Sequence, residues 1–91
     1  MNDTPIYTPE IIYITRYAIT RGIVKARRKN SYGDVEGCSL FYFIARAESR
    51  GVDWHTSLEA AQNRAEQMRQ DKIKAYERAI ERLKKLRITH L

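Results

Sequence analysis

Two segments in the first third of the chain have the pattern of apolar and polar residues that is typical of β-strands. From Ile11 to Tyr17 both sets of alternate residues are mainly β-branched or aromatic. This favours a strand with two apolar faces, located in the middle of a sheet. From Ile23 to Lys29 the alternation is sharper. Lys25, Arg27 and Lys29 would project from one face of the strand, and Val24, Ala26 and Arg28 from the other. This pattern predicts a half-exposed strand with a cationic outer face.

A turn, a third strand and an N-terminal arm complete this part of the prediction. Residues 30–34, Asn-Ser-Tyr-Gly-Asp, have the composition of a turn. Residues 40–46 combine apolar character with two-residue alternation and predict a third strand. Pro5 and Pro9 disfavour regular pairing, so residues 1–10 are expected to form a flexible arm. We therefore expect an antiparallel sheet of three to four strands within residues 11–46.

The last third of the chain predicts one long amphipathic helix over residues 57–88. No glycine or proline interrupts this segment, which is rich in good helix formers. Thr56 and Glu59 have the spacing of a capping box, with Thr56 as the N-cap. Nine apolar residues share one helical stripe: Leu58, Ala61, Ala65, Met68, Tyr76, Ala79, Ile80, Leu83 and Leu86. The expected fold is α+β, a small antiparallel sheet packed on one long C-terminal α-helix in a single domain.

The predicted helix is longer than the predicted sheet. A helix of this length spans about 48 Å, whereas strands of about six residues span only about 20 Å. Its C-terminal half should therefore overhang the sheet and expose an apolar stripe at Tyr76, Ile80, Leu83 and Leu86. Two interpretations remain open: a homodimer formed through this stripe, or a helix that bends near Gln70 and Asp71 and folds back.

Positive charge is concentrated in the predicted sheet. The chain has a net charge of +6, and residues 11–33 contain six basic and no acidic residues. The six are Arg16, Arg21, Lys25, Arg27, Arg28 and Lys29. A concentrated positive patch attracts a polyanion or an acidic protein partner. The competing interpretation is a solvated strand face whose cations discourage aggregation.

No pattern in the sequence predicts catalysis, a metal site or a cofactor. The residues capable of such chemistry, Cys38, His55 and His90, are far apart and lack the paired spacing of metal ligands. The single cysteine cannot form an internal disulfide, and we interpret Cys38 as a packing residue. The longest apolar run has six residues, and the N-terminus lacks the features of a secretory signal. We expect a cytoplasmic protein that is not an enzyme and does not associate with a membrane.

Trp54 and His55 directly precede the predicted helix. The simpler interpretation is that Trp54 fills the gap between the start of the helix and the sheet. The alternative is an exposed pair that stacks on a base or anchors in a protein pocket, which makes Trp54 an interface candidate. The aromatic residues near the basic segment would also suit single-stranded nucleic acid, although no RNP-type motif is present.

Parts of the chain resemble a group of known sequences. Residues 12–23 read Ile-Tyr-Ile-Thr-Arg-Tyr-Ala-Ile-Thr-Arg-Gly-Ile, and residues 65–73 read Ala-Glu-Gln-Met-Arg-Gln-Asp-Lys-Ile. Together with residues 54–61, these segments resemble small uncharacterised proteins of phages and prophages. Those proteins share a strand similar to Y-V-T-K-Y-A-L-T-K-G-I and a C-terminal helix with A-E-x-M-R-x-x-K-I. The resemblance implies a phage or mobile-element context and no particular activity.

The sequence thus favours a small, basic, non-enzymatic binding protein. We expect a phage or prophage accessory factor that acts by protein–protein interaction with a host complex, for example as an inhibitor. The alternative is a nucleic-acid-binding protein that uses the basic strand face.

Overall fold

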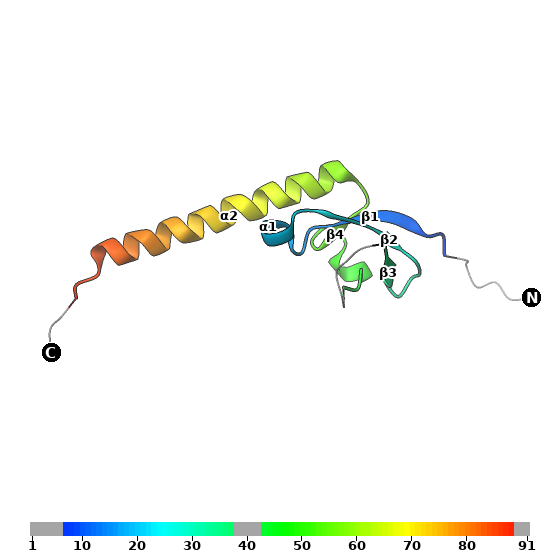
Figure 1. Ribbon diagram of the computed structural model, residues 1–91, viewed down its shortest axis with the longest axis horizontal. Helices are drawn as coiled ribbons and strands as arrows, with labels where there is room; N and C mark the ends of the chain where they lie inside the picture. Colours follow the sequence, from blue (N-terminus) through cyan, green and yellow to red (C-terminus); the bar gives the residue numbers. More distant parts are fainter. Residues whose placement is uncertain (1–6, 38–42, 89–91) are drawn as a thin grey trace, which may run out of the picture.

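The structure, a computed structural model, describes residues 7–37 and 43–88. Its elements in chain order are β1 (Glu10–Ile14), α1 (Ala18–Arg21), β2 (Val24–Arg28), β3 (Val35–Glu36), a 3-10 turn at Ala47–Ser49, β4 (Trp54–His55) and α2 (Leu58–Lys85). Figure 1 shows the strands and α1 gathered at one end of the molecule, with α2 running away from them. The predicted α+β fold, an antiparallel sheet with one long C-terminal helix, is confirmed.

The four strands form one antiparallel sheet in the order β3-β2-β1-β4. β1 lies between β2 and β4, as the apolar residues on both of its faces predict. Tyr13 is the residue that shows this position best, because it pairs with Lys25 of β2 on one side and with His55 of β4 on the other. Directly paired residues project from the same face of a sheet, so this register assigns every strand residue to a face.

The main hydrophobic core lies on one face, which we call the inner sheet face. Ile12, Ile14, Ala26 and Trp54 project from this face, and all four are buried. Phe43 and Ala45, from the segment before the 3-10 turn, cover them. The backbone N–H of Ala45 donates to the carbonyl of Gly33 over 2.8 Å, which holds the covering segment against the turn between β2 and β3. The core is therefore closed by a loop segment, on the side of the sheet opposite α2.

The predicted third strand is only partly within the described residues. Residues 40–42 lie outside them, and residues 43–46 form no strand, so this part of the prediction is wrong. Instead, β3 and β4 are two-residue strands in segments for which no strand was predicted. Two residues are too few to produce a recognisable alternation. These segments become strands because they pair with β2 and β1 in the folded protein.

The N-terminal arm is also shorter than predicted. Residues 1–6 lie outside the described part of the chain, but Tyr7 is held against the sheet. Its hydroxyl accepts a hydrogen bond from Nη1 of Arg28 over 2.8 Å and donates to Oε1 of Glu10 over 3.3 Å. β1 then begins at Glu10, one residue after Pro9.

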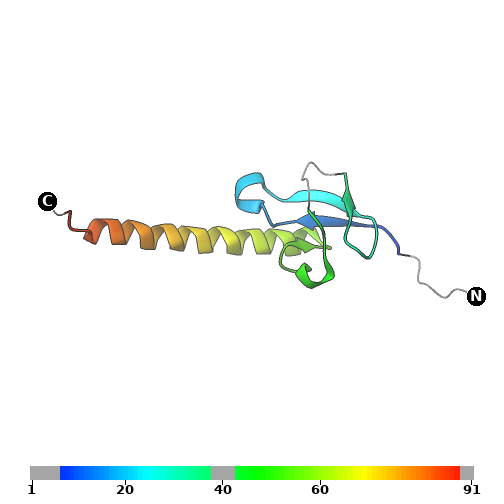
Figure 2. The same cartoon turned by 90° about the horizontal axis from the view of Figure 1, so that it is seen from below.

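Helix α2 begins and ends inside the predicted limits. Its N-cap is Ser57, whose Oγ accepts a hydrogen bond from the backbone N–H of Ala60 over 3.2 Å, so the assignment of Thr56 as N-cap is wrong. Leu86 has an extended conformation, and the helix ends at Lys85 instead of Ile88. It continues without a break through Gln70 and Asp71 (Figure 2), which contradicts the alternative of a helix that folds back.

Among the described residues, only the first turns of α2 pack on other elements, where they contact α1, β4 and β1. Ala61 is fully buried, and Ala65 and Met68 are half-buried. Beyond Met68 every residue of the helix except Ala79 is exposed. Small side chains thus permit close packing at one end, while the other end projects from the domain as the length comparison predicts.

Candidate binding surfaces

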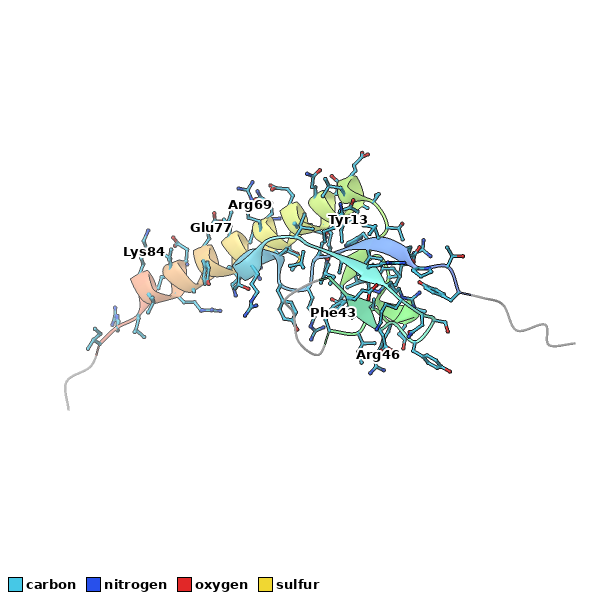
Figure 3. All side chains as sticks on the ribbon, turned by 45° about the vertical axis from the view of Figure 1, so that its right-hand side comes forward. Tyr13, Phe43, Arg46, Arg69, Glu77 and Lys84 are labelled. Atoms are coloured by element: carbon cyan, nitrogen blue, oxygen red, sulfur yellow. The ribbon has the colours of Figure 1, made fainter. Side chains whose placement is uncertain are left out.

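The face of the sheet opposite the core is only partly covered. We call it the outer sheet face, and its residues are Ile11, Tyr13, Lys25, Arg27, Glu36 and His55. In Figure 3 Tyr13 lies on the side of the sheet nearer α2, and Phe43 lies on the opposite side. α2 covers the end of this face that contains His55 and leaves the end that contains Ile11 open.

The open end of the outer sheet face contains a shallow groove of about 390 Å³. The groove is lined by Ile11, Lys25, Ala26, Arg27, Glu36 and Gly37. Ile11 is 45% exposed even though it lies in the interior strand β1. An apolar side chain flanked by cations suits a partner that combines apolar and acidic groups.

The six basic residues predicted to form one patch have different environments. Arg16 pairs with Asp53, with Nη1 and Oδ2 separated by 3.2 Å, and Arg27 pairs with Glu36, with Nη1 and Oε1 separated by 3.5 Å. Arg21, Lys25 and Lys29 are exposed and make no ion pair within residues 7–37 and 43–88. The structure therefore brings Lys25 and Arg27 together on the outer sheet face and places Arg16 and Arg21 outside the sheet, after the end of β1.

Arg28 does not belong to any binding surface, and its assignment to the patch is wrong. Its side chain projects from the inner sheet face and is buried, with an exposed fraction of 7%. Nε donates to the carbonyl of Ala45 over 2.8 Å, Nη1 donates to the hydroxyl of Tyr7, and Nη2 donates to the carbonyl of Ser31 over 3.3 Å. Through these three hydrogen bonds, the guanidinium holds the segments that contain Tyr7, Ser31 and Ala45 against the sheet.

Trp54 is likewise a core residue, so its assignment to an interface is wrong. Its side chain is 1% exposed, and its indole Nε1 donates to the carbonyl of Arg46 over 2.8 Å. The guanidinium of Arg28 lies over its ring on the inner sheet face. The interpretation of Trp54 as a packing residue is confirmed, and the exposed Trp-His pair is not found.

His55 is buried on the outer sheet face beneath the start of α2. The hydroxyl of Thr15 donates to the carbonyl of Val52, so it accepts from Nε2 of His55 over 3.0 Å. Burial lowers the pKa of His55, and the positive charge of Arg64 lowers it further. These contacts make His55 a neutral structural residue.

No metal site is formed by the described residues. Within residues 7–37 and 43–88, no three His, Cys, Asp or Glu side chains come together in a way that could hold an ion. Cys38 and His90, the other residues considered for such chemistry, lie outside the described part of the chain.

A second exposed surface lies on the projecting part of α2. The predicted interface residues Tyr76, Ile80, Leu83 and Leu86 are 60%, 49%, 69% and 62% exposed. The ammonium group of Lys72 lies 5.2 Å from the centre of the Tyr76 ring. The predicted overhang is thus confirmed, and the stripe has no partner within the part of this chain that the structure describes.

No family model, curated protein or solved structure matches this chain. In the part of the chain that the structure describes, none of the helices has both the length and the apolar character needed to cross a bilayer.

Sequence reasoning missed two residues of the outer sheet face. Neither Glu36 nor Ile11 was assigned to a binding surface from the sequence. The pairing of Glu36 with Arg27 depends on β3, which the sequence does not predict. The exposure of Ile11 depends on where α2 leaves the sheet, and no local pattern carries that information.

Proposed function

We propose that the protein is a non-enzymatic binding protein whose outer sheet face docks on a partner protein. The observation that supports this proposal is the open groove, where the exposed side chain of Ile11 lies directly across from Arg27 of β2 and Lys25 lies two residues further along the same strand. A partner segment with an apolar anchor and flanking carboxylates matches this arrangement in both chemistry and charge.

The distribution of charge favours a protein partner over nucleic acid. Binding to a phosphate backbone requires several free cations in a row, since each neutralised phosphate contributes to affinity. On the outer sheet face Arg27 is paired with a carboxylate and Glu36 would repel a phosphate. Arg28 is buried, so the basic segment offers fewer free cations than its sequence suggests.

This function agrees with the resemblance to small phage and prophage proteins. A phage or prophage accessory factor that acts on a host complex needs a docking surface and requires no catalytic group. We therefore propose a bacterial host protein with an acidic surface as the partner.

A pull-down from bacterial lysate tests the proposal, with nuclease added throughout to remove bridging nucleic acid. The variant Lys25→Glu reverses one charge of the groove, and Lys74→Glu makes the same change on the exposed side of α2. We expect wild type and Lys74→Glu to retain the same protein and Lys25→Glu to lose it. Equal retention by all three proteins would exclude the outer sheet face as the docking surface.

Nucleic-acid binding remains the second candidate because of one observation. Tyr32, in the turn that follows Lys29, is 81% exposed and could stack on a base. Contacts from Lys25, Lys29 and Arg21 to three phosphates of duplex DNA would give a log–log salt slope of about −2.7. Fluorescence anisotropy with labelled duplex DNA, single-stranded DNA and RNA at about 50 mM salt tests this directly. Saturable binding that weakens with that slope would favour this second function.

A further inference from the structure

The side of α2 opposite its exposed apolar stripe has a row of positive charge. Its members, which we call the basic row, are Lys74, Arg78, Arg82 and Lys85. They are separated by four, four and three residues, so they project within about 80° of one another around the helix. All four are exposed, and none makes an ion pair within residues 7–37 and 43–88. The basic row is therefore a line of four free cations.

The surroundings of the basic row leave one of its borders free of negative charge. Residues 72–87 contain seven basic and two acidic residues. The two carboxylates, Glu77 and Glu81, lie between the row and the apolar stripe, and Oε1 of Glu81 pairs with Nζ of Lys84 over 3.8 Å. On the other border lie Ala75 and Ala79, whose small side chains let another surface approach the cations closely. A polyanion can therefore lie over the row on the side away from the carboxylates.

The spacing of the basic row matches a regular array of anions. α2 is continuous from Leu58 to Lys85, so the four cations keep fixed positions along about 16 Å of its axis. Neighbouring cations are about 5–6 Å apart along this axis. Each strand of a DNA duplex presents one phosphate for every ~3.4 Å of its axis, so each cation can reach a different phosphate. The row thus provides the several free cations that the outer sheet face lacks.

Three other polyanions fit the basic row less well than duplex DNA. A helix at a membrane surface immerses its apolar face, which would direct the basic row of α2 away from the lipid. Single-stranded nucleic acid binds aromatic platforms, and neither the row nor its borders contains an aromatic residue. Recognition of duplex RNA depends also on contacts to 2′-hydroxyl groups, for which the row has no neutral polar side chain.

We propose that the basic row binds the phosphate backbone of duplex DNA without reading its sequence. Each cation neutralises one phosphate and releases the counterions condensed there, which gives affinity and no base recognition. The row lies where α2 projects beyond the sheet (Figure 1), so a duplex can reach it without colliding with the sheet. This inference concerns a surface separate from the groove and holds whichever partner the groove binds.

Fluorescence anisotropy with the full chain and a labelled DNA duplex tests the inference. Four phosphate contacts should give a log–log salt slope of about −3.6. Arg78→Gln combined with Arg82→Gln removes two of these contacts, so the slope should fall to about −1.8 and binding at about 50 mM salt should weaken at least tenfold. Glutamine is a good helix former, so the far-UV circular dichroism of this variant should equal that of wild type.

Two double variants that remove the same amount of charge are the matched controls. Lys72→Gln with Lys84→Gln acts on α2 outside the basic row, and Lys25→Gln with Lys29→Gln acts on the sheet. Neither removes a proposed contact, and salt screens charges at a distance, so each should bind within about threefold of wild type with the same salt slope.

Four results would overturn the inference. The first is a wild type without saturable binding to duplex DNA at about 50 mM salt. The second is equal weakening by the Lys72 and Lys84 control, which would mean that net charge and not the row sets the affinity. The third is loss of binding in the Lys25 and Lys29 control with retention in the row variant, which would place the contact on the sheet. The fourth is tighter binding to duplex RNA, or to vesicles of phosphatidylglycerol, than to duplex DNA.

Discussion

The guanidinium carbon of Arg28 lies 4.9 Å from the centre of the Trp54 ring, inside the hydrophobic core of the inner sheet face. The same group lies 5.3 Å from the ring of Tyr7, so the cation is enclosed by two aromatic rings. A buried charge is tolerated only when it is paired or fully hydrogen-bonded, and here three oxygen acceptors serve that purpose. Arg28 thereby connects β2, the N-terminal segment and the loop that covers the core.

Replacement of Arg28 should therefore destabilise the fold. Arg28→Ala is expected to lower the free energy of unfolding by about 2–4 kcal/mol, since it leaves the carbonyls of Ala45 and Ser31 without their donor and opens a cavity beside Trp54. The neighbouring variant Arg27→Ala, on the exposed face, should change it by no more than about 0.5 kcal/mol. Urea denaturation followed by tryptophan fluorescence measures both, and equal effects would contradict the structural role of Arg28.

Acidification should destabilise the protein through His55. Burial and Arg64 lower the pKa of His55 in the folded state, so the unfolded chain binds a proton first as the pH falls below 6.5. Stability should therefore be constant above that pH and should decrease as the pH falls from about 6.5 toward the lowered pKa. Urea midpoints measured between about pH 7.5 and about pH 5.5 test this expectation.

Two variants identify the origin of that pH dependence. His55→Gln removes the titrating group and should leave the urea midpoint nearly constant over the same pH range. Arg64→Gln removes a charge that lowers the pKa of His55, so stability should decline less steeply on acidification. A His55→Gln variant with the full pH dependence of wild type would contradict this assignment.

Gly33 is predicted to be irreplaceable at the turn between β2 and β3. It has a φ of +95°, and a Cβ atom at this position would lie 2.5 Å from the carbonyl oxygen of Ala45. Gly33→Ala should therefore cost more than about 2 kcal/mol, from backbone strain and from displacement of the covering segment. Gly51→Ala is the control, because Gly51 has a φ of +84° and a Cβ atom added there would meet nothing within 4 Å. Thermal unfolding should show the larger loss for Gly33→Ala, and a similar loss for both would mean that strain alone matters.

Substitution on the projecting part of α2 should separate assembly from folding. If the homodimer predicted from the sequence forms through the exposed stripe, Ile80→Asp combined with Leu83→Asp places carboxylates against apolar neighbours, and these charges have no partner to offset their desolvation. Light scattering should then give twice the chain mass of 10.7 kDa for wild type and the chain mass itself for the double variant. The near-UV circular dichroism of Trp54 should be unchanged, because Trp54 and the core lie far from residues 80 and 83. Loss of that signal would mean that the projecting part of α2 is required for folding.

The local sequence determined the elements whose signal extends over many residues. α2 was predicted because apolar residues recur with helical period over several turns, and the overhang followed from its length alone. β1 was predicted because β-branched and aromatic residues dominate its sequence, and β2 because its two sets of alternate residues differ in composition. Ser57 replaced Thr56 as the N-cap because both residues can cap a helix and only the position of the first helical turn decides between them.

Tertiary structure decided which residues belong to a surface. The alternation places Arg27 and Arg28 on opposite faces of their strand, but only contacts with distant residues, such as Ala45 17 residues away, determine that Arg28 is buried. The contact of Thr15 with His55 spans 40 residues and converts a candidate binding residue into a core residue. β3 and β4 are strands only because β2 and β1 pair with them. A local pattern records the preference of a segment for helix or strand, whereas burial and pairing depend on what distant segments place beside it.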